Sequence, residues 1–321
     1  MNIDENVVES IVKRVVSQLS TETASAQTCP SGGDWGVFES MNDAVDAAVA
    51  AQREYLNRSM HDRARYVQAI RDVVLDQENL EHISRLAVEE TGMGGYEYKL
   101  IKNRLAAVKT PGIEDLTTDA MSGDDGLTLV EYSPFGVIGS ITPTTNPTET
   151  IICNSIGMLA AGNAVVFSPH PRAKKVSLHL IQLINKALCK AGAPANLVAT
   201  VSAPSIENTN AMMSHPKIRM LVATGGPAIV KTVLSSGKKA IGAGAGNPPV
   251  VVDETADIEK AAKDIVDGCS FDNNLPCIAE KEAIAVDSVA DYLIFNMKKN
   301  GAYEVKDPAV ISQLVELVNI I

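Results

Sequence analysis

The sequence has few cysteines, and none of them has the spacing of a disulfide framework or a zinc site. The five cysteines, at positions 29, 153, 189, 269 and 277, form no CxxC pair and have no pair of histidines nearby. The five histidines show no ligand spacing either. We therefore expect no metal centre and a reducing, intracellular compartment.

Three further features are scarce or missing. Basic residues are in deficit, with 28 Lys and Arg against 39 Asp and Glu and a formal charge of −11, so nucleic acid is not an expected partner. No apolar run reaches the ~18–20 residues needed to cross a bilayer, so no membrane partner is expected. No GxGxxG motif follows an expected strand, so the common dinucleotide fingerprint is absent.

The N-terminal segment has its own character. Residues 1–19 place apolar side chains at helical spacing with polar residues opposite, which predicts one amphipathic helix. Residues 20–33 are rich in Ser, Thr, Ala and Gly and predict a flexible linker. A helix this short is marginal alone and needs a partner for its apolar face. That partner is either another protein or the body or oligomer of this chain.

The rest of the 321 residues, with 45% apolar content overall, is long enough for about two domains. Residues 42–109 predict helices almost throughout and contain nothing with catalytic spacing. From Leu127 onward, short apolar runs alternate with helical stretches, which favours βαβ units and a doubly wound parallel sheet. The expected strands are 137–141, 164–167, 197–201, 220–222 and 250–252.

Ligands of such sheets bind beyond the carboxyl ends of the strands, where loops lead into helix N-termini. Three loops qualify, at residues 142–147, 168–171 and 224–227. The last contains a Thr-Gly-Gly turn with backbone N–H groups for a pyrophosphate, although such short motifs also recur by chance. Residues 242–249 are Gly and Ala followed by Asn and Pro, so they form either a close approach to a planar ligand or merely a tight loop.

Cys277 is the candidate nucleophile. It lies in a polar, proline-interrupted segment, residues 270–281, where a thiolate could be exposed and activated. Cys153 and Cys189 lie in helical apolar patterns and are expected to be buried small hydrophobes, and Cys269 is expected to be similar. Spacing alone leaves the same alternative open for Cys277.

Together these segments resemble the aldehyde dehydrogenase superfamily, and within it the CoA-acylating enzymes of bacterial microcompartments, with those that oxidise propionaldehyde in propanediol utilisation the nearest. The resemblance covers essentially the whole chain. It is carried by EYSPFGVIG at 131–139, TNPTET at 145–150, FSPHP at 167–171, the segment 240–253 with its GAGAGNPP core, and NLPCIAEK at 274–281.

The resemblance implies a fold and a division of the chain. It implies an aldehyde dehydrogenase-like α/β fold with a Rossmann-like NAD-binding domain at 34–256 and an incomplete α/β catalytic domain at 257–321. Residues 1–19 would be an encapsulation-type helix that docks to a microcompartment shell protein. The protein would then be cytoplasmic, in the microcompartment lumen, and full-length members of the family would form homo-oligomers.

The resemblance also implies a reaction, the oxidation of a short aldehyde to acyl-CoA with NAD and coenzyme A. Propionaldehyde is the favoured substrate, and acetaldehyde is possible. Cys277 would attack the aldehyde to give a thiohemiacetal, and the Asn146 amide with the Cys277 backbone N–H would hold its oxyanion. Hydrolytic relatives carry a glutamate within the segment that corresponds to 242–249, and this sequence has none. A thiol of pKa about 8.5 needs less base assistance than water, so acyl transfer to CoA is favoured.

By the same resemblance, the NAD phosphates should lie by Thr224, Gly225 and Gly226. Ser168 and Pro169 should lie near the adenosine end. The expected cofactor site is completed by Thr142, Pro143 and Gly244.

The end of the chain leaves an alternative open. A helix is expected from Pro308, and its apolar stripe runs to Ile321 without a polar tail, which suggests missing sequence. Family members continue beyond this position. The chain could therefore be a truncated, inactive relative that retains shell docking or NAD binding, or a fragment that does not fold alone.

Overall fold

The structure, a computed structural model, describes residues 32–320, with side chains described through residue 317. The helix expected at 1–19 and most of the linker expected at 20–33 lie outside the described residues.

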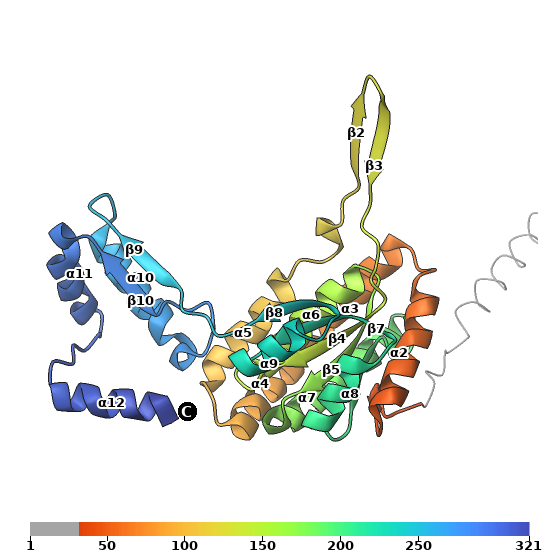
Figure 1. Ribbon diagram of the computed structural model, residues 1–321, viewed down its shortest axis with the longest axis horizontal. Coiled ribbons are helices and arrows are strands. Elements are labelled where there is room, and N and C mark those ends of the chain that lie inside the picture. Colours follow the sequence, from red (N-terminus) through yellow and green to blue (C-terminus); the bar gives the residue numbers. More distant parts are fainter. Residues whose placement is uncertain (1–31, 321) are drawn as a thin grey trace, which may run out of the picture.

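A six-stranded parallel sheet forms the centre of the larger part of the molecule (Figure 1). The strand order is β1-β6-β5-β4-β7-β8. The chain therefore winds outward from β4 through β5 to β6, and then continues on the other side of β4 with β7 and β8. This reversal makes the sheet doubly wound, as the sequence predicted. Its strands are β1 (Val37–Phe38), β4 (Val137–Thr142), β5 (Ala164–Pro169), β6 (Val198–Val201), β7 (Ile218–Thr224) and β8 (Lys239–Ala243).

Helices cover both faces of this sheet. Helices α6 and α7 pack on one face, and α2 and α8 pack together on the other. Helices α3, α4 and α5 form a further layer outside α6 and α7. The helices are α2 (Met41–Tyr55), α3 (Met60–Leu75), α4 (Gln77–Thr91), α5 (Tyr96–Lys109), α6 (Pro147–Ala160), α7 (Lys174–Lys190), α8 (Ile206–Ser214) and α9 (Pro227–Leu234), with short 3-10 turns η1 (Ile113–Asp115) and η2 (Pro171–Ala173).

Polar caps fix where the N-terminal helices begin and end. The Ser40 hydroxyl accepts the Asp43 N–H at the start of α2. Ser59 and Asp62 form a reciprocal capping box at the start of α3. Gly92 ends α4 in the left-handed conformation, with φ of 67°. These signals lie in the sequence itself, so the helical segments were predictable.

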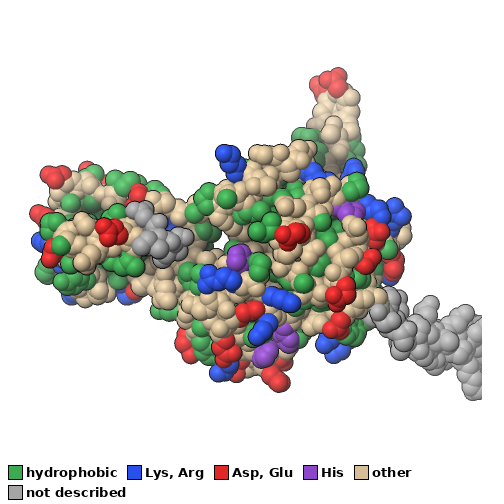
Figure 2. Space-filling model, turned by 60° about the horizontal axis from the view of Figure 1, so that its bottom comes forward, with side chains coloured by type: hydrophobic (Ala, Val, Ile, Leu, Met, Phe, Trp, Pro, Cys, Tyr) green, Lys and Arg blue, Asp and Glu red, His purple; other side chains and the backbone are tan. Residues whose placement is uncertain are grey.

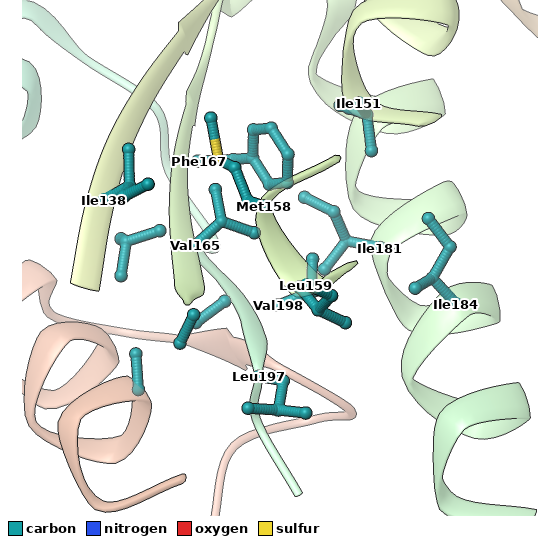
Figure 3. Packing of buried hydrophobic residues seen from close by; sticks show 14 of the residues in the cluster. Ile138, Ile151, Met158, Leu159, Val165, Phe167, Ile181, Ile184, Leu197 and Val198 are labelled. Carbon is teal, nitrogen blue, oxygen red and sulfur yellow. The ribbon is translucent and has the colours of Figure 1, made fainter. Parts of the chain in front are cut away.

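The core lies on both faces of the sheet, and Figure 3 shows the part of it that packs against α6 and α7. Val165 and Phe167 of β5 face Leu159 of α6 and Ile181 of α7, and all four side chains are fully buried. The central strands are buried on both faces, and this explains why they are continuous apolar runs instead of alternating patterns.

Tyr55 provides a test of how α2 is held to α6. Its hydroxyl donates to the Leu159 carbonyl at 2.9 Å, and burial raises the pKa of the phenol. The unfolded chain loses this proton near pH 10 while the folded chain keeps it, so the unfolding free energy should fall as pH rises above 10, by up to ~1.4 kcal/mol per pH unit. Tyr55→Phe should cost ~1 kcal/mol at pH 7 and flatten that slope.

Urea unfolding between pH 7 and 11 measures both effects. The exposed Tyr303 is the control, and Tyr303→Phe should leave the pH dependence unchanged. An equal slope in the wild type and Tyr55→Phe would contradict the assignment.

A second, smaller part follows β8. It contains β9 (Pro249–Val252) and β10 (Glu282–Ala285) as a parallel pair, with α10 (Ile258–Ser270), the 3-10 segment η3 (Phe271–Asn274), α11 (Asp287–Lys299) and α12 (Pro308–Ile320). Its small core comprises Val252, Ala262, Ile265 and Leu293. Figure 2 shows it as a lobe joined to the body by a narrow waist.

The position of β9 corrects the sequence analysis. We expected the strand at 250–252 to belong to the first domain, ending at residue 256, but β9 pairs with β10 and has no partner in the six-stranded sheet among the described residues. The change of sheet therefore falls between β8 and β9. A short apolar run predicts a strand, but it carries no information about which strand pairs with it.

An antiparallel hairpin was not expected from the sequence. Strands β2 (Asp119–Gly123) and β3 (Gly126–Val130) project far from the body (Figure 1). Their apolar side chains, among them Met121, Leu127 and Leu129, are exposed. In the described part of the chain, no helix is both long enough and apolar enough to cross a membrane.

Candidate active site

A cavity of about 630 Å³ opens at the carboxyl ends of β4, β5 and β7, where the strand order reverses. Its other wall is formed by the segment between β8 and β9 and by the loop that follows η3. The loops of the first wall converge on one space because parallel strands end at the same edge of the sheet. The structure brings all ten residues that the sequence analysis selected to this cavity: Thr142, Pro143, Asn146, Ser168, Pro169, Thr224, Gly225, Gly226, Gly244 and Cys277.

Cys277 lies on an exposed loop at the wall that belongs to the smaller lobe. Lys281 holds this loop together, because its ammonium donates to the Asn274 side-chain oxygen at 2.6 Å and to the Pro276 and Ala279 carbonyls at 3.2 and 3.3 Å. Lys281 also lines the cavity. A lysine that bonds neutral carbonyls leaves its positive charge beside the loop that carries the thiol.

Gly246 packs directly against the Cys277 loop. A Cβ at Gly246 would lie 2.1 Å from the Cys277 carbonyl oxygen, closer than any real Cβ contact. From the sequence alone, the small residues of segment 242–249 had two possible reasons, a close approach to a planar ligand or merely a tight loop. In the structure the backbone at Gly246 does approach another group closely, and that group is the loop that carries Cys277.

The Cys277 loop is entered through three consecutive left-handed residues. Asp272, Asn273 and Asn274 have φ of 48°, 55° and 59°, a conformation that Asn and Asp tolerate better than most residues. The buried Asp272 carboxylate accepts the Gly95 N–H at 2.9 Å, which ties this segment to the start of α5. Strained backbone of this kind persists where the surroundings enforce it.

Asn146 lies at the opposite wall, at the N-terminus of α6. Its side chain makes no capping bond to the helix. Its amide oxygen instead accepts from the Lys102 ammonium at 2.5 Å, and its amide nitrogen donates to the Thr145 hydroxyl at 3.3 Å. The positive end of the α6 dipole reaches the cavity at this point, so negative charge that develops here is stabilised.

The Thr-Gly-Gly turn leads into α9, as expected, but not all of its N–H groups are available. The Gly225 N–H donates to the Ala243 carbonyl at 3.0 Å and so ties β7 to β8. Donors for an anion must therefore come from Gly226 and the first turn of α9.

The end of β5 and the loop that follows it, residues 168–171, also line the cavity. The Ser168 hydroxyl shares a hydrogen bond of 2.8 Å with Thr209 of α8. His170 also lines the cavity, and burial together with the nearby Arg172 lowers the pKa of its ring. The imidazole is therefore neutral at pH 7, and its Nδ1 accepts the Arg172 N–H at 3.2 Å.

Thr142 has a hydroxyl that the protein leaves unused. The residue is 1% exposed, lines the cavity, and its Oγ1 has no hydrogen-bond partner among the described residues. A buried hydroxyl without a partner costs free energy, so a ligand that bonds it gains affinity.

We expect Thr142→Val to separate stability from binding. Valine has nearly the same shape and no hydroxyl, so the unfolding free energy should stay unchanged or rise by ~1 kcal/mol, while NAD binds about five- to tenfold more weakly. Calorimetric titration with NAD and urea unfolding measure the two quantities. Thr128→Val on the exposed β3 is the control and should alter neither. Unchanged NAD affinity in Thr142→Val would show that the hydroxyl has no ligand role.

Comparison with known proteins identifies the family. The model of the aldehyde dehydrogenase family matches residues 36–309. The chain belongs to the aldehyde dehydrogenase family. The resemblance and the fold that the sequence motifs implied are thereby confirmed.

Among curated relatives, the propanal dehydrogenase (CoA-propanoylating) of Salmonella typhimurium is 52% identical over 302 residues, which are 94% of this chain and 64% of that protein. The chain therefore spans about 64% of the length of this relative.

Two solved structures are also similar to this aldehyde dehydrogenase chain. The propionaldehyde dehydrogenase of Rhodopseudomonas palustris, solved with bound CoA and an acylated cysteine, is 78% identical with a TM-score of 0.84, and the match covers 88% of this chain and 64% of that one. A propionaldehyde dehydrogenase from the fucose utilisation microcompartment of Clostridium phytofermentans is 56% identical with a TM-score of 0.81, covering 85% and 62%.

The sequence analysis missed two lysines of this site. We expected nothing with catalytic spacing in residues 42–109, but Lys99 and Lys102 of α5 reach the site. The apolar residues of α5 form a stripe at helical spacing, and such a stripe normally indicates the buried face of a helix. In the structure this stripe is exposed and the two lysines are buried: Tyr98, Ile101, Leu105 and Val108 face outward.

The remaining cysteines differ in their environments. Cys153 was expected to be buried and is half-buried, and burial raises the pKa of its thiol. Cys269 was expected to be buried and is exposed, because it lies in the last turn of α10, beyond the small core that contains Ala262 and Ile265. No group of three potential metal ligands occurs among residues 32–320.

Proposed function

We propose that this chain catalyses the oxidation of a short-chain aldehyde, propionaldehyde rather than acetaldehyde, to acyl-CoA with NAD and coenzyme A. One observation carries the proposal. Cys277 and Asn146 face each other across a cavity at the switch point of the sheet, and none of the described residues that line it is Asp or Glu. A nucleophilic thiol and an amide donor are therefore present without the carboxylate that would activate water.

The chemistry follows from these groups. The Cys277 thiolate attacks the aldehyde carbon, and the resulting thiohemiacetal oxyanion is held by the Asn146 amide and the α6 N-terminus. NAD, when bound, accepts the hydride. The thioester on Cys277 is then attacked by the CoA thiolate, which releases the Cys277 thiolate, acyl-CoA and, over the cycle, one proton.

We assign the NAD phosphates to Thr224, Gly225 and Gly226, with Gly226 and the start of α9 as donors. Thr142, Pro143 and Gly244 complete the proposed cofactor site, and Ser168 and Pro169 receive the adenosine end. All of these residues line the cavity, which supports the assignment. The Rossmann-like arrangement, in which the ligand binds where the strand order reverses, gives the physical reason.

We also propose that the protein works inside a bacterial microcompartment. The similar enzyme of Clostridium phytofermentans comes from such a compartment, and residues 1–19 have the amphipathic pattern of a docking helix. Fusing residues 1–19 to a fluorescent protein tests the address. The fusion should co-localise with shell proteins, and a fusion that stays diffuse would exclude docking through this segment.

The activity is tested by following NADH absorbance with propionaldehyde in the presence and absence of CoA. Turnover that requires CoA and yields a thioester supports the proposal, and a parallel series with acetaldehyde measures the preference. Turnover without CoA that yields a carboxylate would place the chain among the hydrolytic enzymes. Normal NAD binding by calorimetry without any turnover would favour the inactive relative that retains binding.

A further inference from the structure

Four charged side chains form a buried cluster behind the active-site cavity. Lys99 and Lys102 come from α5, Glu149 from α6 and Asp272 from η3, and they are 0, 8, 9 and 0% exposed. Two positive and two negative groups balance, as burial demands. The Lys102 ammonium lies 3.0 Å from Glu149 and in direct contact with Asp272, and Lys99 lies 3.7 Å from each carboxylate.

The two lysines differ in their remaining contacts. Lys99 donates to the Thr145 backbone carbonyl at 2.6 Å, whereas Lys102 donates to the Asn146 side-chain oxygen at 2.5 Å. An ammonium group has three donors and no acceptor, so the amide atom that faces it must be the oxygen. The contact with Lys102 therefore fixes which way the Asn146 amide is turned.

This orientation matters for catalysis. An asparagine side chain can rotate to present either its carbonyl or its NH2, and only the NH2 stabilises an oxyanion. Among residues 32–320, the only other hydrogen bond of this side-chain amide is the long one of 3.3 Å to the Thr145 hydroxyl, which is too weak to set the orientation alone. Lys102 is also in contact with Asp272, which anchors the segment that leads to Cys277.

We propose that Lys102 is a positioning residue, which orients the Asn146 amide so that its NH2 faces the oxyanion of the Cys277 adduct. The proposal rests on the proposed function. Lys102 does not touch the reacting atoms, and it acts through a hydrogen bond that holds a donor in place before the charge develops. The same ammonium bonds the amide at one wall and the Asp272 anchor of the other, so it also fixes the two catalytic segments relative to each other.

The test uses two variants of nearly equal length and equal charge. Removing Lys102 alone would leave an unpaired buried carboxylate, so each variant also carries Glu149→Gln, which keeps the cluster neutral. In Lys102→Met/Glu149→Gln the donor to Asn146 is lost, and in Lys102→Gln/Glu149→Gln an NH2 donor is kept. Glu149→Gln alone is the control.

We expect the methionine variant to lose about a hundredfold in the CoA-dependent rate, mainly in kcat, and the glutamine variant to stay within about tenfold of the wild type. Glu149→Gln alone leaves the cluster with one excess positive charge, so this protein should melt at a lower temperature. The contact of Lys102 with Asn146 is kept, and the rate should change less than about threefold. Adding Asn146→Ala to the methionine variant should cause no further loss beyond that of Asn146→Ala alone, because both changes remove the same donor.

Equal losses in the methionine and glutamine variants, or losses that multiply when Asn146→Ala is added, would overturn the inference. Thermal melting of every variant identifies a loss that comes from unfolding. In that case the glutamine variant and its combination with Asn146→Ala decide the matter. A wild-type chain that shows no CoA-dependent turnover would refute the proposed function. A wild type that turns over, together with a methionine variant of equal rate, would refute only the role of Lys102.

Discussion

Cys277→Ala is expected to abolish NADH formation from propionaldehyde and CoA, with a fall of about 10⁴-fold or more. Alanine removes the sulfur that forms the bond to the aldehyde, and in its absence neither the hydride transfer nor the acyl transfer has a covalent intermediate. The folded chain should be unaffected, since Cys277 lies on an exposed loop and contributes little to either core. The measurements are the NADH absorbance, the thioester product and the melting temperature.

Cys269→Ala is the matched control for this prediction. Cys269 is a second exposed thiol, eight positions before Cys277, and it lines a different, smaller cavity beside α10 and β10. Its replacement should leave turnover within about twofold, because no group of the proposed reaction touches it. Alkylation with iodoacetamide should inactivate the wild type and Cys269→Ala alike. Activity that survives in Cys277→Ala but not in Cys269→Ala would reassign the nucleophile.

Gly246→Ala is the second change with a large expected effect. The added methyl would lie 2.1 Å from the Cys277 carbonyl oxygen and 3.1 Å from its carbonyl carbon, so the loop must move. Forced overpacking costs about 1–3 kcal/mol of unfolding free energy, and a shift of ~1 Å at the nucleophile costs about a hundredfold in rate. We expect Gly246→Ala to lose both unfolding free energy and turnover rate, and the rate of Cys277 alkylation to change.

Gly244→Ala separates the clash from the general effect of adding a methyl to this segment. A Cβ at Gly244 meets nothing within 4 Å, so the melting temperature and the alkylation rate of Cys277 should match the wild type. Turnover is not the readout for this control, because Gly244 lies on the wall assigned to the cofactor. A Gly246→Ala protein that melts and alkylates like Gly244→Ala would show that the Cys277 loop adjusts freely.

Much of the local structure follows from the sequence because its signals are local. Ser40, Ser59 and Gly92 mark helix ends through bonds that span a few residues. The alternation of apolar runs and helices predicted the parallel sheet, and the rule that ligands bind beyond strand ends placed Thr142, Asn146 and the Thr-Gly-Gly turn at one edge. Cys277 stood out among the cysteines because of its polar, proline-containing loop.

Tertiary structure decided what local signals do not encode. The apolar stripe of α5 is exposed and its two lysines are buried, because the lysines are neutralised by carboxylates that are far away in sequence, Glu149 and Asp272. The sheet membership of β9 depended on its pairing with β10, more than thirty residues later. Periodicity shows that a helix or strand has two different faces, whereas the energy that decides between them comes from partners brought near by the fold.

The sequence thus indicated the class of fold, and the family resemblance of its motifs suggested the two residues proposed for the chemistry, the thiol of Cys277 and the amide of Asn146. Only the tertiary structure decided which way that amide faces and what packs against the thiol, through Lys102 and Gly246. The physical reason is that a side chain's identity fixes which bonds it can make. The arrangement of neighbours in space fixes which of those bonds it does make.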